Sequence, residues 1–144
     1  MRAVLVDLDA VLGDTRPLWL AWLGDLRRRS RIELDDLPED RQAATAILDE
    51  RLANWRALLE RFAAEHAPVY LRPDPGANAR LRKLAEAARV GAFTDAPPEL
   101  AHAALMHLGA GRRVACVGTL AEVSEQLGND AVVVRTRAEL AALP

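Results

Sequence analysis

Four short segments of the chain are apolar on both faces and rich in β-branched residues. They are residues 3–6, 90–93, 114–117 and 131–134. Runs of this kind are typical of parallel strands that are covered on both faces. Amphipathic patterns, with apolar residues three or four apart, separate or follow the later runs. They cover residues 77–88, 98–108, 120–127 and 138–143. This alternation predicts a doubly wound α/β sheet.

Residues 16–73 break the alternation, because their apolar positions keep the helical spacing throughout. One helix is predicted to open at Pro17, and a second to run from about residue 39 to residue 65. A helix of that length would be roughly 40 Å long, which is too long to lie entirely against so small a sheet. We therefore expect an antiparallel helical pair above the first strand. Residues 16–73 would form this cap, and residues 1–15 and 74–144 the α/β core.

Composition and charge indicate one compact domain. The chain has 144 residues, of which 51% are hydrophobic and 28% charged, and its net charge is −2. This charge gives no electrostatic reason to bind nucleic acid, and no apolar run approaches the length of a membrane span. The single cysteine, Cys116, excludes an internal disulfide and fits a reducing compartment. We expect a cytoplasmic protein without nucleic-acid or membrane partners.

The candidate chemistry begins where the first apolar run ends, in the stretch VLVDLDAVLGDT. Asp7 and Asp9 follow each other with the period of two that places side chains on the same side of a strand. Two carboxylates so placed repel each other unless a cation or a proton lies between them. The alternative is that both acids only form a turn after the strand.

Residues after the other strands are expected to meet this pair, because ligands of open α/β sheets lie beyond the carboxyl ends of the strands. The second strand is followed by Thr94 and Asp95, and the third by Gly118 and Thr119. Thr94 and Asp95 would serve equally as the cap of the helix that begins near Pro98.

Several segments resemble motifs of the haloacid dehalogenase (HAD) superfamily. VLVDLDAVLGDT resembles its first motif, GAFTDAPPEL its second and VACVGTLAEV its fourth. PDPGANARLRKLAEA and NDAVVVRTRAEL are similar to the re-entry after the helical cap and to the last strand of the phosphoglycolate-phosphatase-like branch. The resemblance implies a Rossmannoid three-layer sandwich. Its reduced sheet of about four parallel strands would have the order 4-3-1-2, with the cap inserted after the first strand.

The resemblance also implies roles for individual residues. Asp7 would be the nucleophile that forms an aspartyl-phosphate, and Asp9 the general acid and base. The phosphate of a small phosphorylated metabolite would be bound by Thr94, Asp95, Gly118 and Thr119. A Mg²⁺ ion would be held by Asp7, Asp9 and Glu122.

Two departures from the family pattern imply weak or lost phosphatase activity. Thr119 stands where the fourth motif has an aspartate, and the interval between Thr94 and Gly118 is too short for the β-α unit that carries a lysine. The chain thus resembles a shortened and degenerate member of the superfamily, and one hypothesis is that it is a pseudoenzyme. The alternative function is a non-catalytic module that binds a ligand or a protein. A homodimer is expected to cover the long apolar seam of residues 44–62 or an open sheet edge.

Overall fold

The computed structural model describes residues 3–144. Its centre is one parallel sheet of four strands in the order β3-β2-β1-β4. The strands are β1 (Ala3–Asp7), β2 (Arg89–Phe93), β3 (Cys116–Gly118) and β4 (Val132–Val134). All four lie within or next to the runs that the hydrophobic pattern predicted. Val4 and Leu5, which face opposite sides of β1, are at most 1% exposed, as expected of a strand that is covered on both faces. The edge strands β3 and β4 are less buried than predicted: β3 is half-buried, and β4 buries only Val134.

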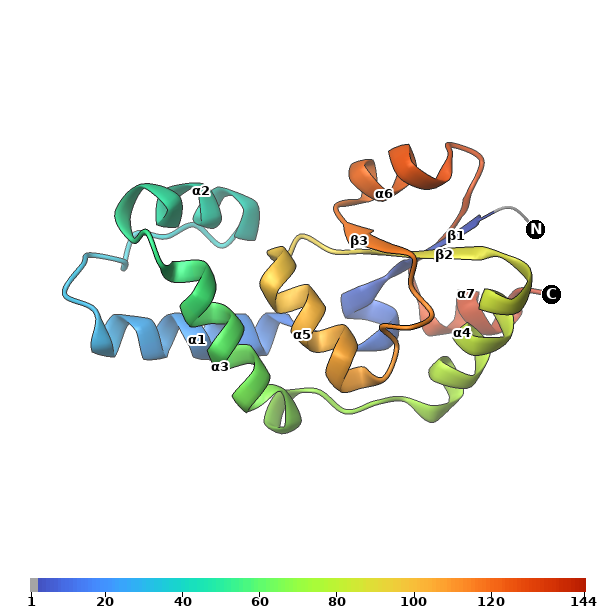
Figure 1. Cartoon of the computed structure of the whole chain (residues 1–144), viewed down its shortest axis with the longest axis horizontal. Helices are drawn as coiled ribbons and strands as arrows, with labels where there is room; N and C mark the ends of the chain where they lie inside the picture. Colours follow the sequence, from blue (N-terminus) through green and yellow to red (C-terminus); the bar gives the residue numbers. More distant parts are fainter. Residues whose placement is uncertain (1–2) are drawn as a thin grey trace.

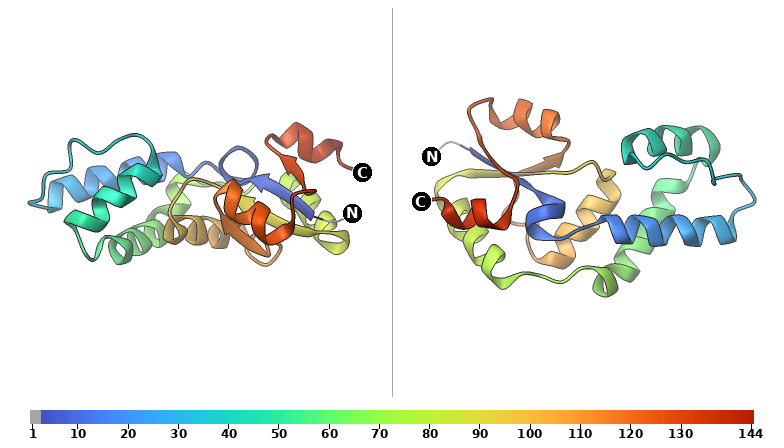
Figure 2. Two further views of the ribbon diagram at one scale, coloured as in Figure 1. Left: turned by 90° about the horizontal axis from the view of Figure 1, so that it is seen from above. Right: turned by 180° about the vertical axis from the view of Figure 1, so that it is seen from behind.

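Helices cover both faces of the sheet, which confirms the predicted three-layer α/β architecture (Figures 1 and 2). The core helices are α4 (Pro75–Ala87), α5 (Pro98–Leu108), α6 (Leu120–Leu127) and α7 (Arg137–Ala142). Helix α6 covers one face, where Val123 packs against Leu5 and Phe93. Helices α4, α5 and α7 lie on the other face. Gly91 permits the close approach of α6, because a Cβ there would meet Leu127 Cδ1 at 2.9 Å.

The predicted strand order 4-3-1-2 is wrong. Strand β3 pairs with β2, through Gly91 and Cys116 among others, and β4 pairs with β1. The connection through α5 places β3 on the outer side of β2, next to the strand that precedes it along the chain, which is the commoner arrangement. Helix α6 then carries the chain across the opposite face to β4. The strand that flanks β1 on its other side is therefore β4, and the residues that follow β3 lie one strand farther from Asp7 than predicted.

The inserted segment is helical, as predicted, but it contains three helices. They are α1 (Arg16–Arg29), α2 (Arg41–Arg51) and α3 (Trp55–Tyr70). The expected single helix over residues 39–65 is broken at residues 52–54, where Leu52 has an extended backbone. After this break Trp55 is buried, and its indole N–H donates to Asp49 Oδ1 at 2.8 Å. Helix α3 packs along α1 and along the core helix α5.

The apolar seam that suggested a dimer interface is covered within one chain. Ala44, Leu48, Trp55 and Leu59 are at most 1% exposed. This observation removes one of the two reasons for expecting a homodimer. The other reason is an open sheet edge, and edge strand β4 does expose Val132 and Val133. The homodimer stays a prediction. Among residues 3–144 there is no helix with the length and apolarity that a membrane span requires.

Candidate active site

Asp7 lies at the carboxyl end of β1, where the chain enters the π-helical turn η1 (Leu8–Leu12). Its Oδ1 accepts hydrogen bonds from the backbone N–H groups of Asp9, at 3.1 Å, and Ala10, at 3.3 Å. The side chain therefore does form the turn, as the structural alternative proposed. Within the described residues, no hydrogen bond reaches its second oxygen, Oδ2. Asp7 is thus held by one oxygen, which leaves the other available to a ligand.

Asp9 is held much more tightly. Its Oδ1 accepts from the backbone N–H of Thr15 at 2.8 Å and from the Thr15 hydroxyl at 2.5 Å. Its Oδ2 accepts from the Thr94 hydroxyl at 2.7 Å and from Arg41 Nη2 at 3.2 Å. A carboxylate offers about four acceptor positions, so every position of Asp9 is filled by the protein itself.

Arg41 is the site residue that sequence reasoning missed. It is the first residue of cap helix α2, and its side chain is only 3% exposed. Its Nη1 donates to the Thr15 hydroxyl at 2.7 Å. Its Nε and Nη2 both donate to Asp95 Oδ1, at 3.1 and 2.5 Å. One guanidinium therefore joins the cap to the loops that follow β1 and β2, and it supplies the cation that acids at the end of β1 require.

Thr94 does not cap helix α5, whose N-cap residue is Pro97, and its hydroxyl is bonded within the protein. Its hydroxyl donates to Asp9 and accepts from the backbone N–H of Ala96 at 3.1 Å, so it orders the turn before α5 while it anchors the acid. Its backbone N–H donates to the carbonyl of Gly118 at 2.9 Å. Asp95, by contrast, faces Arg41 and is half exposed. Because the Thr94 hydroxyl already donates its hydrogen to Asp9, it can donate to a phosphate oxygen only if it first breaks that hydrogen bond.

Thr119 and Glu122 form hydrogen bonds to each other. The Thr119 hydroxyl accepts from the backbone N–H of Glu122 at 3.2 Å, and Glu122 Oε1 accepts from the Thr119 backbone N–H at 3.0 Å. This capping box begins α6, and the backbone hydrogen bond from Thr119 lowers the pKa of Glu122. The structure therefore does not bring Glu122 to Asp7 and Asp9 as a metal ligand.

The donor set does not fit Mg²⁺ in this arrangement. Mg²⁺ requires octahedral oxygen ligation with carboxylates that are free to bind it. Asp7 offers one free oxygen and Asp9 none, and a guanidinium already lies against Asp9. Within residues 3–144, no three acidic, histidine or cysteine side chains gather where they could hold a metal ion.

A cavity of about 430 Å³ opens in front of these residues at the carboxyl edge of the sheet. Asp7, Asp9, Thr94, Asp95 and Thr119 contribute to its wall, so five predicted site residues share one pocket, whereas Gly118 and Glu122 line a smaller adjoining one. Three arginines also line the larger pocket: Arg16, Arg41 and Arg135.

The two arginines other than Arg41 differ in their partners. The Arg16 guanidinium donates to both oxygens of Asp14, and its hydrogen bond holds the Asp14 pKa below the ordinary value. The Arg135 guanidinium lies 5.6 Å from the centre of the Phe93 ring. Arg135 follows directly after β4, the strand that flanks β1. A positive side chain therefore stands at the position beside β1 where the resemblance leads one to expect metal-binding acids.

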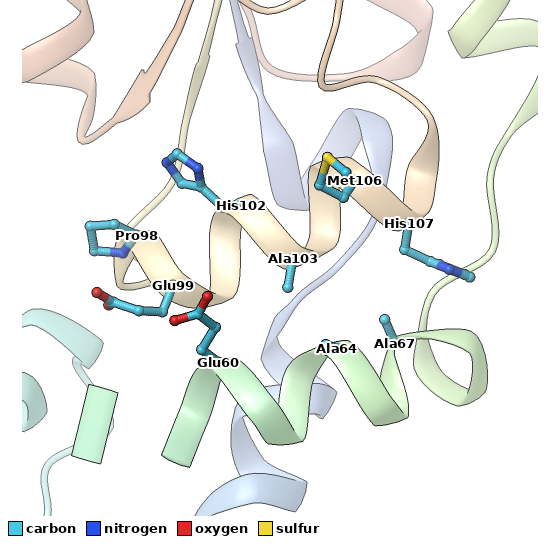
Figure 3. A pocket seen from close by; sticks show the side chains of 9 residues that line it. All are labelled: Glu60, Ala64, Ala67, Pro98, Glu99, His102, Ala103, Met106 and His107. Atoms are coloured by element: carbon cyan, nitrogen blue, oxygen red, sulfur yellow. The ribbon is translucent and has the colours of Figure 1, made fainter. Parts of the chain in front are cut away.

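A larger groove of about 760 Å³ lies away from these residues, between α3 and α5 (Figure 3). Ala67 and Ala103 point into the space between the two helices, and Glu60 and Glu99 stand at one end. None of the predicted site residues lines it. The chemistry that the strand ends provide is therefore confined to the smaller pocket.

Comparison with known proteins supports the fold. No protein-family model matches the chain, and no curated protein matches it in sequence. Among solved structures, the chain is similar to the crystal structure of a putative beta-phosphoglucomutase from Thermotoga maritima, with a TM-score of 0.51 and 20% identity. The alignment covers 92% of this chain and 75% of that chain. The two proteins therefore share an α/β fold.

The position of Thr119 leads to a prediction that differs from the one its motif suggests. Restoring an aspartate there would be expected to recover metal binding if β3 flanked β1. With β2 between them, the two strands lie roughly 10 Å apart, at about 4.8 Å per strand. Thr119→Asp is therefore expected to keep the helix cap and to give no Mg²⁺-dependent gain in phosphatase activity. Thr119→Ala should cost about 1 kcal/mol of unfolding free energy.

Urea unfolding and a phosphatase assay of both variants, with and without Mg²⁺, would test this. A Mg²⁺-dependent gain in Thr119→Asp alone would show that Thr119 does belong to a metal site.

Proposed function

We propose that the chain is a HAD-like hydrolase whose pocket at the carboxyl edge of the sheet binds a small phosphorylated metabolite, and that its Mg²⁺-dependent turnover is weak or absent. The observation that carries the proposal is the arrangement of Asp7 and Asp9. Asp7 ends a central strand with one oxygen free, and Asp9 is anchored by Thr94 from the adjacent strand.

The charges around the pocket favour a phosphorylated ligand. Arg135 and Arg16 line the pocket together with Asp7, and arginine is well suited to binding phosphate oxygens. The Arg135 guanidinium makes no ion pair within the described residues, so it is available to an anion. The solved structure with the same fold is described as a putative beta-phosphoglucomutase, a name that implies a phosphorylated substrate.

The same residues argue against efficient hydrolysis. If Asp7 attacks phosphorus, a P–O bond to Asp7 forms, the P–O bond to the leaving alkoxide breaks, and that oxygen must take up a proton. Asp9 is the predicted donor, but both of its oxygens already accept hydrogen bonds from groups of the protein, so it must break one of these bonds before it can reach the leaving oxygen. A donor set that does not fit Mg²⁺ and an Asp9 whose oxygens are all bonded within the protein leave no group in place to stabilise the leaving oxygen.

A phosphatase assay combined with a binding assay tests the proposal. We expect that a generic phosphomonoester is hydrolysed slowly or not detectably with Mg²⁺. A panel of phosphorylated sugars and acids should nevertheless raise the thermal unfolding midpoint, and Arg135→Gln should reduce that rise. Exposed Arg137, two residues farther along, offers a control as Arg137→Gln.

Brisk Mg²⁺-dependent hydrolysis that Asp7→Asn abolishes would contradict the weak-turnover part of the proposal. Failure of every phosphorylated compound to bind would contradict the ligand class. The second outcome would favour the alternative function, a non-catalytic interaction module. The specific observation that supports this alternative is that Arg41 already occupies the carboxylates of Asp9 and Asp95.

A further inference from the structure

The geometry points to Arg41 as a resident cation of the site: its guanidinium takes the place beside Asp9 that a divalent metal would have to take, and it makes the site independent of metal. This inference rests on the same site as the proposed function, but it concerns the charge balance of the protein alone. It therefore needs no substrate for its test.

The contacts of Arg41 are those of a structural counter-ion. The guanidinium bonds Asp9 at 3.2 Å, Asp95 at 2.5 Å and the Thr15 hydroxyl at 2.7 Å, and its side chain is 3% exposed. Buried charges persist where they are paired and hydrogen-bonded. Here one buried cation is shared by two carboxylates that come from different strand ends. Removal of the cation would leave two acids facing one space with no positive charge between them.

The position of the guanidinium also excludes a metal from Asp9. A hard cation would need Asp9 Oδ2, which already accepts from Arg41 and Thr94. A metal that approached this oxygen would also have to lie close to a positive guanidinium, and like charges at that separation repel strongly in a partly buried site. Arg41 and a divalent ion are therefore alternatives at this place.

The cation belongs to the cap. The charge balance of the site therefore depends on where the cap lies relative to the core. Arg41 stands at the end of α2 that faces the carboxyl edge of the sheet (Figure 1). Asp9 and Asp95 belong to the core. The ion pairs therefore hold this end of the cap on the site, as a metal-free equivalent of the ligand bridge that a bound ion would otherwise provide.

The test compares two arginines of the same helix. Arg41→Gln removes the resident cation, and Arg51→Gln removes the arginine at the other end of α2, which pairs with Asp36 at the surface. Binding of Mn²⁺ to each purified protein is measured by electron paramagnetic resonance, and thermal unfolding is measured with and without Mg²⁺. Mn²⁺ serves as the probe because it prefers the same oxygen ligands as Mg²⁺.

We expect wild type and Arg51→Gln to show neither Mn²⁺ binding at the site nor stabilisation by Mg²⁺. Arg41→Gln should bind Mn²⁺ at least about tenfold more tightly than wild type, because the pocket that Asp7, Asp9 and Asp95 line then loses a buried positive charge and Asp9 Oδ2 loses one of its donors. Its unfolding midpoint should rise with Mg²⁺, and Asp9→Asn in the same background should remove that rise.

Two outcomes would overturn the inference. One is Mn²⁺ binding to the wild-type protein that Asp9→Asn abolishes, and the other is a folded Arg41→Gln that responds to metal no more than Arg51→Gln does. If Arg41→Gln does not fold, Arg41→Lys keeps the charge with a narrower reach. It is expected to fold without gaining a metal response, and a gain would contradict the inference. Phosphate-ester binding can fail in every variant without affecting this result, which separates the two proposals.

Discussion

Replacement of Arg41 by methionine is expected to destabilise the folded chain by about 3–5 kcal/mol, because breaking a buried ion pair leaves an uncompensated charge behind. Methionine retains much of the apolar volume of the side chain, so the loss would come from the guanidinium. Asp9 would lose one of its four donors, Thr15 would lose a donor to its hydroxyl, and Asp95 would lose its ion pair. Urea unfolding of the two proteins would measure the difference.

A double-mutant cycle separates charge from packing. If the cost arises from unpaired acids, Arg41→Met combined with Asp9→Asn should cost less than the sum of the two single changes. Arg51→Met is the control, since the pair of Arg51 with Asp36 is solvent-exposed and such pairs contribute little to stability. Additive costs for Arg41 and Asp9 would show that the guanidinium stabilises the fold by packing and not by pairing these charges.

Much of the site was predictable from the apolar run of the first strand and the two acids that follow it. The apolar run that ends in Asp7 and Asp9 fixes a carboxyl strand end, and parallel strands bring the residue after the next strand, Thr94, to the same edge. The structure does bring these side chains together, with the Thr94 hydroxyl on Asp9. That part of the prediction depends only on local pattern and on the direction of the strands.

The sequence pattern predicted that the two acids require a cation, but it did not predict that Arg41 supplies it. Two acids at a strand end call for a cation, and the sequence offers many arginines that would serve. Arg41 is separated from Asp9 by 32 residues and from Asp95 by 54. Its selection depends on how the cap helices fold back on the core, which brings the start of α2 to the ends of β1 and β2. The break between α2 and α3 was not predictable either, because the helical periodicity of residues 44–62 continues across it.

The prediction of the strand order was wrong for a related reason. Strands β3 and β4 are both short apolar runs, and each is followed by a residue that suits a helix cap: Thr119 after β3 and Thr136 after β4. Periodicity cannot say which of them flanks β1, because both connections are long enough to reach that place. The predicted order therefore came from the family resemblance, and the structure does not follow it. The order decides the chemistry, since it puts Arg135 and not Thr119 beside the strand that carries Asp7.

The second large effect is expected in the cap, where Trp22→Ala should cost about 3–5 kcal/mol of unfolding free energy. Trp22 is 1% exposed, and its ring centre lies 5.3 Å from that of Trp19 and 6.1 Å from that of Trp55. Removal of the indole leaves a cavity between α1 and α3 and ends both aromatic contacts. Leu20→Ala is the matched control on the same helix: Leu20 is 64% exposed, and its truncation should change stability by less than about 0.5 kcal/mol.

The same variants also show whether cap and core unfold together. All three tryptophans lie in α1 and α3, so their fluorescence reports the cap, whereas far-ultraviolet circular dichroism reports every helix. Because α3 packs along α5 and Arg41 bridges the cap to both strand loops, we expect the two signals to give one transition in wild type and a common shift in Trp22→Ala. If only the fluorescence transition shifts, the cap is a separate cooperative unit. The contacts of Arg41 are then too weak to couple it to the core.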